Sequence, residues 1–472
     1  MDDQTNNHPP SQPNYWGKAL WLLACIMALV LPPGITKNAI LTKANQSQDP
    51  LVRAPLLIRV SAITPWDQNI STDLAVSLAT SPAKAVKALE TQDALGWLSP
   101  FAEIIYAQSL DKMGEDFQAI SILEKLEQEG TLDVGGTLYL ASIYHRHANF
   151  AREWQVLQGA LAKNPNNPQI EWKIKLIQIA FGVEKVVLSQ IPDGISPVAF
   201  QRLQNAASHP ETFSRAISSG IALMGLGENE LAQFCFERAV QIQPSVSDAW
   251  AWLAISKVDP NNPVPASLAF SRALRAEEKT TQFPLLAGQY YLASAQPKMA
   301  AKAFKQATQT EPTSSGAWLG YGLSIADENL VSSLAALQKA SELAPSDPEV
   351  WQAIAEVCLR NESYIQQTAF PAIEQLISLR PEDPRTWILR ARAEIATNDP
   401  SGALESLDIA KNLTKSDATH AEALFYKGWL YYLQGDSASS RATFGMVLDQ
   451  YPQSPFANEA KAILEQIKGS VR

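Results

Sequence analysis

The chain has 472 residues, of which 46% are hydrophobic and 18% charged, a composition that excludes disorder as its dominant state. Its formal net charge of -10 argues against nucleic acid as a partner, because phosphate binding needs a basic surface. Three cysteines are too few for a disulfide framework, and five histidines leave little material for metal sites.

The N-terminus is expected to carry a membrane anchor. Residues 1–14 are polar and rich in Asn, Gln and Pro, which predicts a disordered tail. Residues 15–31 read YWGKALWLLACIMALVL, with Lys18 as the only charge. As a helix this run spans about 25 Å, slightly less than a hydrocarbon core of ~30 Å. We therefore predict a single-pass transmembrane signal-anchor helix over 15–31.

Two other interpretations of this segment stay open. A cleaved signal peptide fits the length of the apolar run, although no clean small-x-small site follows before Ala44. A lipoprotein signal would use Cys25 after Leu22-Leu23-Ala24, although most of the apolar run follows that cysteine. Basic residues after the run favour a cytoplasmic repeat region, whereas the signal-anchor mode favours an extracytoplasmic one. We expect the extracytoplasmic side.

Residues 32–65 contain five prolines, and we expect an irregular linker there. From Trp66 onward, apolar-periodic segments of about a dozen residues alternate with helix stops such as NPNNP and APSDPE. This alternation predicts one helix after another, and a degenerate helical pair over 66–99 opens the series.

The helical segments repeat at a period of 34 residues. Within each unit, position 8 is Gly or Ala and position 24 is large and apolar. The small side chain lets the first helix lie close to the second, and the large one fills the groove between helices. Position 4 is Trp in four units, and position 32 is Pro in six. The nine units are 100–133, 134–167, 213–246, 247–280, 281–314, 315–347, 348–383, 384–417 and 421–454.

This pattern resembles the tetratricopeptide repeat family. The best match is 281–314, with Gly288, Tyr291, Ala300, Phe304, Ala307 and Pro312 in phase. The resemblance implies an all-α fold, a right-handed helical-repeat solenoid. Two repeat units occupy 100–167, seven occupy 213–454, and a capping helix ends the chain at 455–472. Between the two arrays, 168–212 is either a degenerate repeat or a break.

The sequence offers little material for catalysis. It contains no glycine-rich phosphate loop, and His145 and His147 point about 200° apart on a helix, so they cannot chelate one ion. Cys235 and Cys358 lie on apolar helix faces and are expected to be buried thiols. We therefore expect no catalytic, cofactor or metal site. Glu153 stands where Ala is usual, so we expect unit 134–167 to be splayed.

Candidate partner-binding residues follow from the resemblance, because positions 2, 5, 9 and 12 of each unit face the concave groove in that family. This face is mostly apolar and lacks the recurrent Lys/Asn set that clamps a C-terminal carboxylate. Phe425, Trp429 and Tyr432 share one helical stripe and are either binding anchors or packed against a capping helix over 455–468. The selected groove residues are Leu285, Gln289, Leu319, Leu323, Gln352, Glu356, Ile388, Arg392, Phe425, Trp429 and Tyr432.

The expected function is a non-catalytic, membrane-anchored scaffold that mediates protein-protein interaction. Its groove would hold an extended peptide or an amphipathic helix from a protein partner. Two alternatives stay open, an accessory subunit of an envelope polysaccharide synthesis or secretion machine and a purely structural spacer. The identity of the partner and the oligomeric state are not specified by the sequence.

Overall fold

The computed structural model describes residues 36–469, except 185, 189, 193 and 415. Over these residues the fold is all-α, with one isolated β-bridge between Val246 and Glu278. The chain divides into two compact units, the first ending at Ser208 and the second beginning at His209. This division falls inside the segment 168–212.

The segment predicted to span a membrane, 15–31, lies outside the described residues. Among the helices that are described, none combines the length and the apolarity that a bilayer crossing requires.

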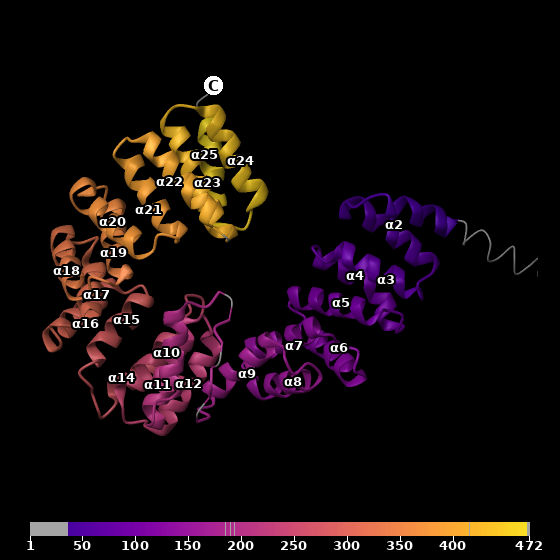
Figure 1. Ribbon diagram of the computed structural model, residues 1–472, viewed down its shortest axis with the longest axis horizontal. Helices are drawn as coiled ribbons and strands as arrows, with labels where there is room; N and C mark the ends of the chain where they lie inside the picture. The colour runs from indigo at the N-terminus through magenta and orange to yellow at the C-terminus, as the bar shows by residue number, and fades with distance from the viewer. Residues whose placement is uncertain (1–35, 185, 189, 193, 415, 470–472) are drawn as a thin grey trace, which may run out of the picture. The chain divides into compact units, whose positions relative to one another are not determined.

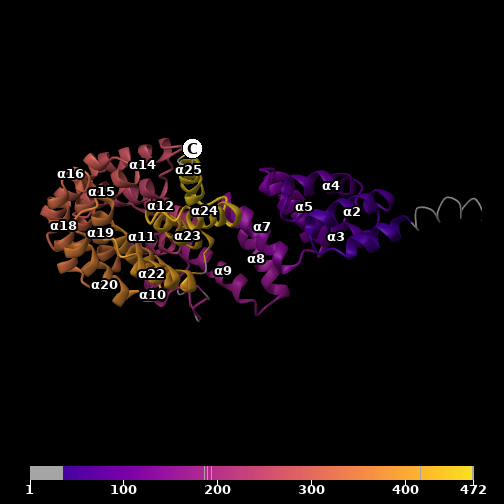
Figure 2. The same cartoon turned by 90° about the horizontal axis from the view of Figure 1, so that it is seen from above.

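Over its described residues, the first unit contains residues 36–45 in helical conformation and nine further helices, and α2 to α5 lie together in both views (Figures 1 and 2). Its core includes residues from α2 through α8. The helices are α2 (Pro50–Ile63), α3 (Gln68–Leu78), α4 (Pro82–Ala94), α5 (Pro100–Lys112), α6 (Asp116–Glu129), α7 (Val134–Arg146), α8 (Phe150–Lys163), α9 (Pro168–Ala180) and α10 (Pro197–Ala207).

The prediction of an irregular linker over 32–65 is wrong where the structure describes it, because the helical residues 36–45 and α2 together occupy most of that stretch. Pro50 stands in the first turn, where its missing N–H costs nothing, and the Asp49 carboxylate caps the helix by accepting from the Leu51 N–H at 2.9 Å. Pro55 lies inside the helix but on its exposed side. Pro50 and Pro55 both belong to a helix, so the prolines of this stretch do not indicate a linker.

The second unit is a succession of helix pairs that follow one another around a curved stack (Figure 1). The first helices of neighbouring pairs contact one another from α13 through α23. The helices are α11 (Thr212–Gly225), α12 (Asn229–Ile242), α13 (Ser247–Ser256), α14 (Val264–Arg275), α15 (Phe283–Ala293), α16 (Pro297–Thr310), α17 (Ser315–Ile325), α18 (Leu330–Leu343), α19 (Pro348–Arg360), α20 (Phe370–Leu379), α21 (Pro384–Ala396), α22 (Pro400–Leu413), α23 (Asp417–Leu433), α24 (Ser437–Gln450) and α25 (Pro455–Gly469), with a π-helical turn η1 (Ile365–Ala369) before α20.

Positions 8 and 24 of a unit meet in the structure. A β-carbon added at Gly288 would lie 2.6 Å from the ring of Phe304, which is 1% exposed. The same relation links Gly220 to Phe236, Gly428 to Phe444 and Gly322 to Leu337. Because the large side chain occupies the space that the missing β-carbon leaves, glycine at position 8 sets how closely the two helices approach.

A hydrogen bond joins consecutive units through the tryptophans at position 4. In each of four units the indole Nε1–H donates to the carbonyl of the proline six residues earlier, at 2.8–2.9 Å. That proline ends the second helix of the preceding unit. The bonds run from Trp250, Trp318, Trp351 and Trp387 to Pro244, Pro312, Pro345 and Pro381, and they fix the turn between units.

Unit 348–383 is two residues longer than the period, and the turn after α19 absorbs the difference. Tyr364 adopts a left-handed backbone conformation with φ +59°, and residues Ile365–Ala369 then form the wide π-helical turn η1 before α20 begins. A π-helical turn takes up extra residues without interrupting the helix that follows.

Unit 134–167 contains a histidine–carboxylate contact where most other units have alanine. Glu153 is 1% exposed, and its Oε2 lies 3.0 Å from Nδ1 of His145 on the preceding helix. The helices α7 and α8 remain packed against each other. His145 therefore accommodates the carboxylate of Glu153, the residue from which splaying of this unit was expected.

Removing His145 and removing Glu153 are expected to change the free energy of unfolding by different amounts. His145→Ala should lower the free energy of unfolding by about 1–3 kcal/mol, because it leaves the buried Glu153 carboxylate without this partner. Glu153→Ala restores the usual residue and should change stability much less. The double variant should recover most of the loss, as measured by urea denaturation. An equal loss in both single variants would contradict this assignment.

Candidate functional site

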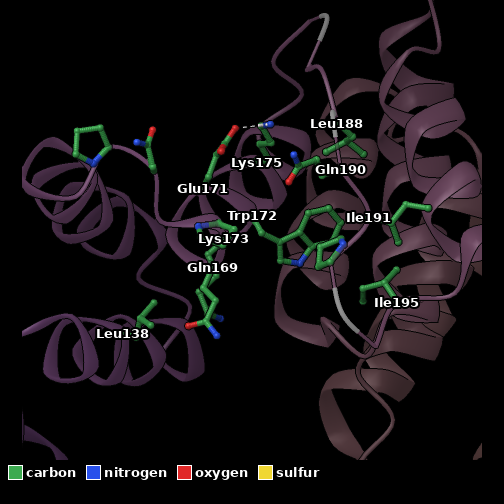
Figure 3. A pocket seen from close by; sticks show the side chains of 14 residues that line it. Leu138, Gln169, Glu171, Trp172, Lys173, Lys175, Leu188, Gln190, Ile191 and Ile195 are labelled. Carbon is green, nitrogen blue, oxygen red and sulfur yellow. Dashed lines mark ion pairs between the residues drawn. The ribbon is translucent and has the colours of Figure 1, made fainter.

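A cleft of about 770 Å³ opens in the first unit, between α7, the start of α9 and the segment that follows α9 (Figure 3). Leu138 enters from α7, and Gln169, Trp172 and Lys173 enter from α9. On the other side, Figure 3 shows Leu188, Gln190, Ile191 and Ile195 along the irregular segment.

The cleft exists because α9 is not followed at once by a second helix. Gly182 takes φ +72° directly after the last turn of α9, a conformation that ends the helix. The described residues between 183 and 195 form no helix or strand, and the Ser196 side chain then accepts from the Ala199 N–H at 3.1 Å and starts α10. An open segment therefore borders α9 where a second helix stands in other units.

The α9 side of the cleft continues the repeat pattern. Counted from Pro168, Gln169 and Trp172 occupy positions 2 and 5, which face the groove in the resembled family, and Leu138 is position 5 of the preceding unit. Gln169 and Trp172 are not among the groove residues predicted from the sequence, because 168–212 departs from the pattern elsewhere. The proline at 168 followed by an aromatic residue at position 5 was the available signal.

Trp172 gives the cleft an aromatic wall that is held in place. Its indole stacks on Phe200 of α10, with ring centroids 6.3 Å apart and planes 17° apart. Both Trp172 and Lys173 are half-buried, and Gln169 is exposed. Glu171 and Lys175 neutralise each other in an ion pair of 2.6 Å. The cleft thus combines an indole and aliphatic side chains with amides and one cationic side chain, Lys173.

The eleven groove residues selected from the sequence lie on first helices of the second unit. Eight are half-buried and Glu356 is exposed. Ile388 and Phe425 are only 1% and 6% exposed and pack in the core, although Phe425 also lines a pocket beside Trp429. The half-buried residues are Leu285, Gln289, Leu319, Leu323, Gln352, Arg392, Trp429 and Tyr432.

Charged residues gather on the inner helices α19 to α23. The guanidinium of Arg392 lies over the ring of Tyr426, 5.3 Å from its centroid. Burial raises the pKa of Glu422, and Arg392 and Arg385 oppose that increase. Burial also raises the pKa of the Tyr426 hydroxyl. Because Arg392 interacts with both groups, this candidate residue belongs to a polar cluster rather than standing alone.

The aromatic stripe of α23 divides between core and surface. Phe425 packs on Phe456 of α25, with centroids 5.3 Å apart. Trp429 stacks on Tyr432, with centroids 5.4 Å apart, and borders a pocket of about 400 Å³ together with Ile463 of α25. The terminal helix therefore covers Phe425, while Trp429 and Tyr432 keep partial access to solvent.

The two cysteines that the structure describes are poorly suited to nucleophilic chemistry. Burial raises the pKa of the Cys235 thiol to about 12 and that of Cys358 to about 11. Both thiols are therefore protonated at neutral pH. Within residues 36–469 that are described, no group of three or more His, Cys, Asp or Glu side chains is arranged to hold a metal ion.

Comparisons with solved structures find chains of similar helical architecture at low identity. A structure titled as the APC/C hetero-tetramer Cut9-Hcn1 covers 95% of this chain and 92% of its own, with 14% identity and a TM-score of 0.39. A tetratricopeptide repeat protein from Parabacteroides merdae covers 54% and 99%, with 13% identity and a TM-score of 0.41. Human IFIT1, solved as a dimer with m7Gppp-AAAA, covers 78% and 81%, with 15% identity and a TM-score of 0.44.

No curated protein matches the chain. The tetratricopeptide repeat family matches it at residues 218–246, 285–348 and 422–454. These matches fall on units whose paired helices the structure describes and whose positions 8 and 24 are in contact. The chain therefore contains repeats that match the tetratricopeptide repeat family over these residues.

Proposed function

We propose that this chain is a non-catalytic, membrane-anchored scaffold that holds an extended segment of a protein partner in the cleft beside Trp172. The observation that carries the proposal is the cleft itself, a space of about 770 Å³ with a fixed indole on its α9 side. Pockets that combine aromatic and aliphatic walls with a few polar groups are typical of binding sites.

The chemistry of the cleft favours a peptide with an apolar side chain followed by an acidic one. Trp172 and Ile191 offer apolar surface for the first, and Lys173 offers a cation for the second. The amides of Gln169 and Gln190 can donate to and accept from an extended backbone. Tryptophan in such a position is the residue type that most often dominates a protein interface.

The proposed anchor is the apolar run 15–31, and the proposed location of the repeats is extracytoplasmic. A single charge at Lys18 in a run of this apolarity supports the anchor. Trp429, Tyr432 and Arg392 form a second candidate surface for the same or another partner. An anchored array would keep its partner near the bilayer.

The test is purification of the full-length protein from its native membrane in mild detergent, followed by identification of the proteins that accompany it. Trp172→Ala is compared with Trp66→Ala, a matched control in which a 62% exposed tryptophan is removed far along the chain from the cleft. Gln169→Glu, at an exposed position, provides a second cleft variant that leaves the indole stacking intact. Circular dichroism checks that each variant is folded.

We expect a near-stoichiometric partner that is lost in both cleft variants and kept in the control. Retention of the partner in all three variants would exclude the cleft and direct attention to Trp429 and Tyr432. Co-purification of an envelope polysaccharide would instead favour the accessory-subunit alternative, for which the aromatic face of Trp172 is the favouring observation. Absence of any specific partner would favour the structural spacer.

A further inference from the structure

The outward face of α2 carries an apolar stripe. Leu51, Pro55, Ile58 and Ala62 follow one another at spacings of four, three and four residues, so they fall within an arc of about 60° on the helix. All four are exposed, Leu51 by 75% and Ile58 by 42%. The stripe therefore runs almost the full length of α2 in contact with solvent.

The opposite face of the same helix is apolar as well. Leu57 and Val60 are fully buried there, Leu57 within the core of the first unit, and Ala54 is buried at the edge of the stripe. A surface helix of a globular protein is normally apolar on one face and polar on the other. An α2 that is apolar on both faces needs a second apolar environment beyond the repeat array.

The charge around α2 differs from that of the chain. Residues 36–63 contain four basic residues and one acidic residue, whereas the whole chain carries a net charge of -10. Two of these basic side chains pair with aspartates of the same unit, at 2.6 and 3.1 Å. Lys43 and Arg59 are exposed, and Arg59 lies beside the stripe. An apolar stripe with Arg59 beside it, on a segment of net positive charge, matches an anionic lipid surface.

Chain length keeps α2 close to the proposed anchor. Leu31 ends the apolar run, and the described helical residues start at 36, a separation that extended chain limits to about 18 Å. The helical residues 36–45 then add ~15 Å, and residues 46–49 add at most about 14 Å before α2 begins. The path to α2 is thus short, and part of it is helical and cannot extend further.

We infer that the stripe of α2 lies in the headgroup region of an anionic bilayer, with Arg59 directed toward lipid phosphates. This inference rests on the membrane anchor of the proposed function. It adds a second contact with the membrane, one that would orient the first unit on the bilayer surface. Amphipathic helices bury their apolar face in this region of a bilayer.

The test places a bimane fluorophore on the stripe of the full-length protein. Ile58→Cys is made in a Cys25→Ala background, where Cys235 and Cys358 are both fully buried and do not react. The control is Val331→Cys on α18, an aliphatic position that is 67% exposed. Each protein is reconstituted into vesicles of phosphatidylcholine mixed with phosphatidylglycerol. Quenching is measured with aqueous iodide and with acyl-brominated lipid, and flotation reports vesicle binding.

We expect iodide to quench the label at residue 58 at least about threefold less than the label at 331, because the headgroup region shields a side chain buried in it. Brominated lipid should quench only the label at 58. Equal iodide quenching at both positions in protein that floats with vesicles would overturn the inference and leave the anchor intact. Protection from both quenchers at 58 would overturn it in favour of a protein contact. Protein that does not float would refute the proposed anchor itself.

Discussion

Replacing Phe304 by alanine is expected to lower the free energy of unfolding of the second unit by about 3–5 kcal/mol, the range found for removal of a buried aromatic ring. The ring is 1% exposed and fills the space above Gly288 of its own unit. It also abuts Gly320 on the first helix of the next unit, where an added β-carbon would overlap it. The substitution therefore opens a cavity both between the two helices of one unit and between that unit and the next.

The loss of stability should appear first in the helices around Phe304 and only then in the whole unit, because each repeat contacts only its neighbours. Hydrogen exchange should show the largest loss of protection in α15, α16 and α17, while urea denaturation reports the total change. The matched control is Phe117→Ala, which removes the same side chain at a position that is 84% exposed and should change stability by less than about 0.5 kcal/mol. A similar loss in both variants would contradict the role assigned to Phe304.

Gly320→Ala should destabilise the same joint by about 1–3 kcal/mol, the usual cost of overpacking a filled core. The added methyl group would overlap the Phe304 ring, and the ring cannot move aside because it is fully enclosed. The usual gain of about 0.5–1 kcal/mol from replacing a helical glycine by alanine is too small to offset this.

The matched control for Gly320 lies one turn earlier on the same helix. Gly316 is exposed, and an added β-carbon there meets nothing within 4 Å. Gly316→Ala should therefore leave stability unchanged or raise it slightly. Thermal and urea unfolding of the two variants measure the contrast, and a stabilising Gly320→Ala would contradict the close approach of α16 and α17.

The 34-residue period predicts the helix pairs of the second unit, because the positions that define the repeat are also the positions at which its helices pack. Gly288 and Phe304 were in phase in the sequence and are in contact in the structure. The indole-to-proline hydrogen bonds between units were not foreseen, although both residue types had been noted. A bond between a helix and the turn before it depends on rotamer and turn geometry, which a period does not encode.

The first unit was predicted less well, because its sequence departs from the period at both ends. Pro55 made α2 resemble a linker, although a proline on the outer face of a helix is compatible with the buried Leu57 and Val60 opposite. Trp172 was missed because the unit that begins at Pro168 lacks an immediate second helix. The absence of that helix, which disguised the repeat, is also what opens the cleft.

The groove residues were transferred by position, and position alone does not determine exposure. Ile388 and Phe425 occupy groove positions but are enclosed by their neighbours, in the case of Phe425 by Phe456 of the terminal helix. Trp429 is on the same helical stripe and stays partly accessible. Which residue of a stripe is covered depends on the size of the side chains beside it.

The proposed function requires that the cleft beside Trp172 hold a protein segment in the cell. Site-specific photocrosslinking tests it most directly, with a photoreactive phenylalanine analogue placed at Gln169 in the cleft and, as control, at Gln158 on α8, both exposed. Our account predicts one crosslinked protein of defined mass from position 169, abolished by Lys173→Glu, and none from position 158. Crosslinking of the same proteins from both positions, or of none from 169, would contradict it.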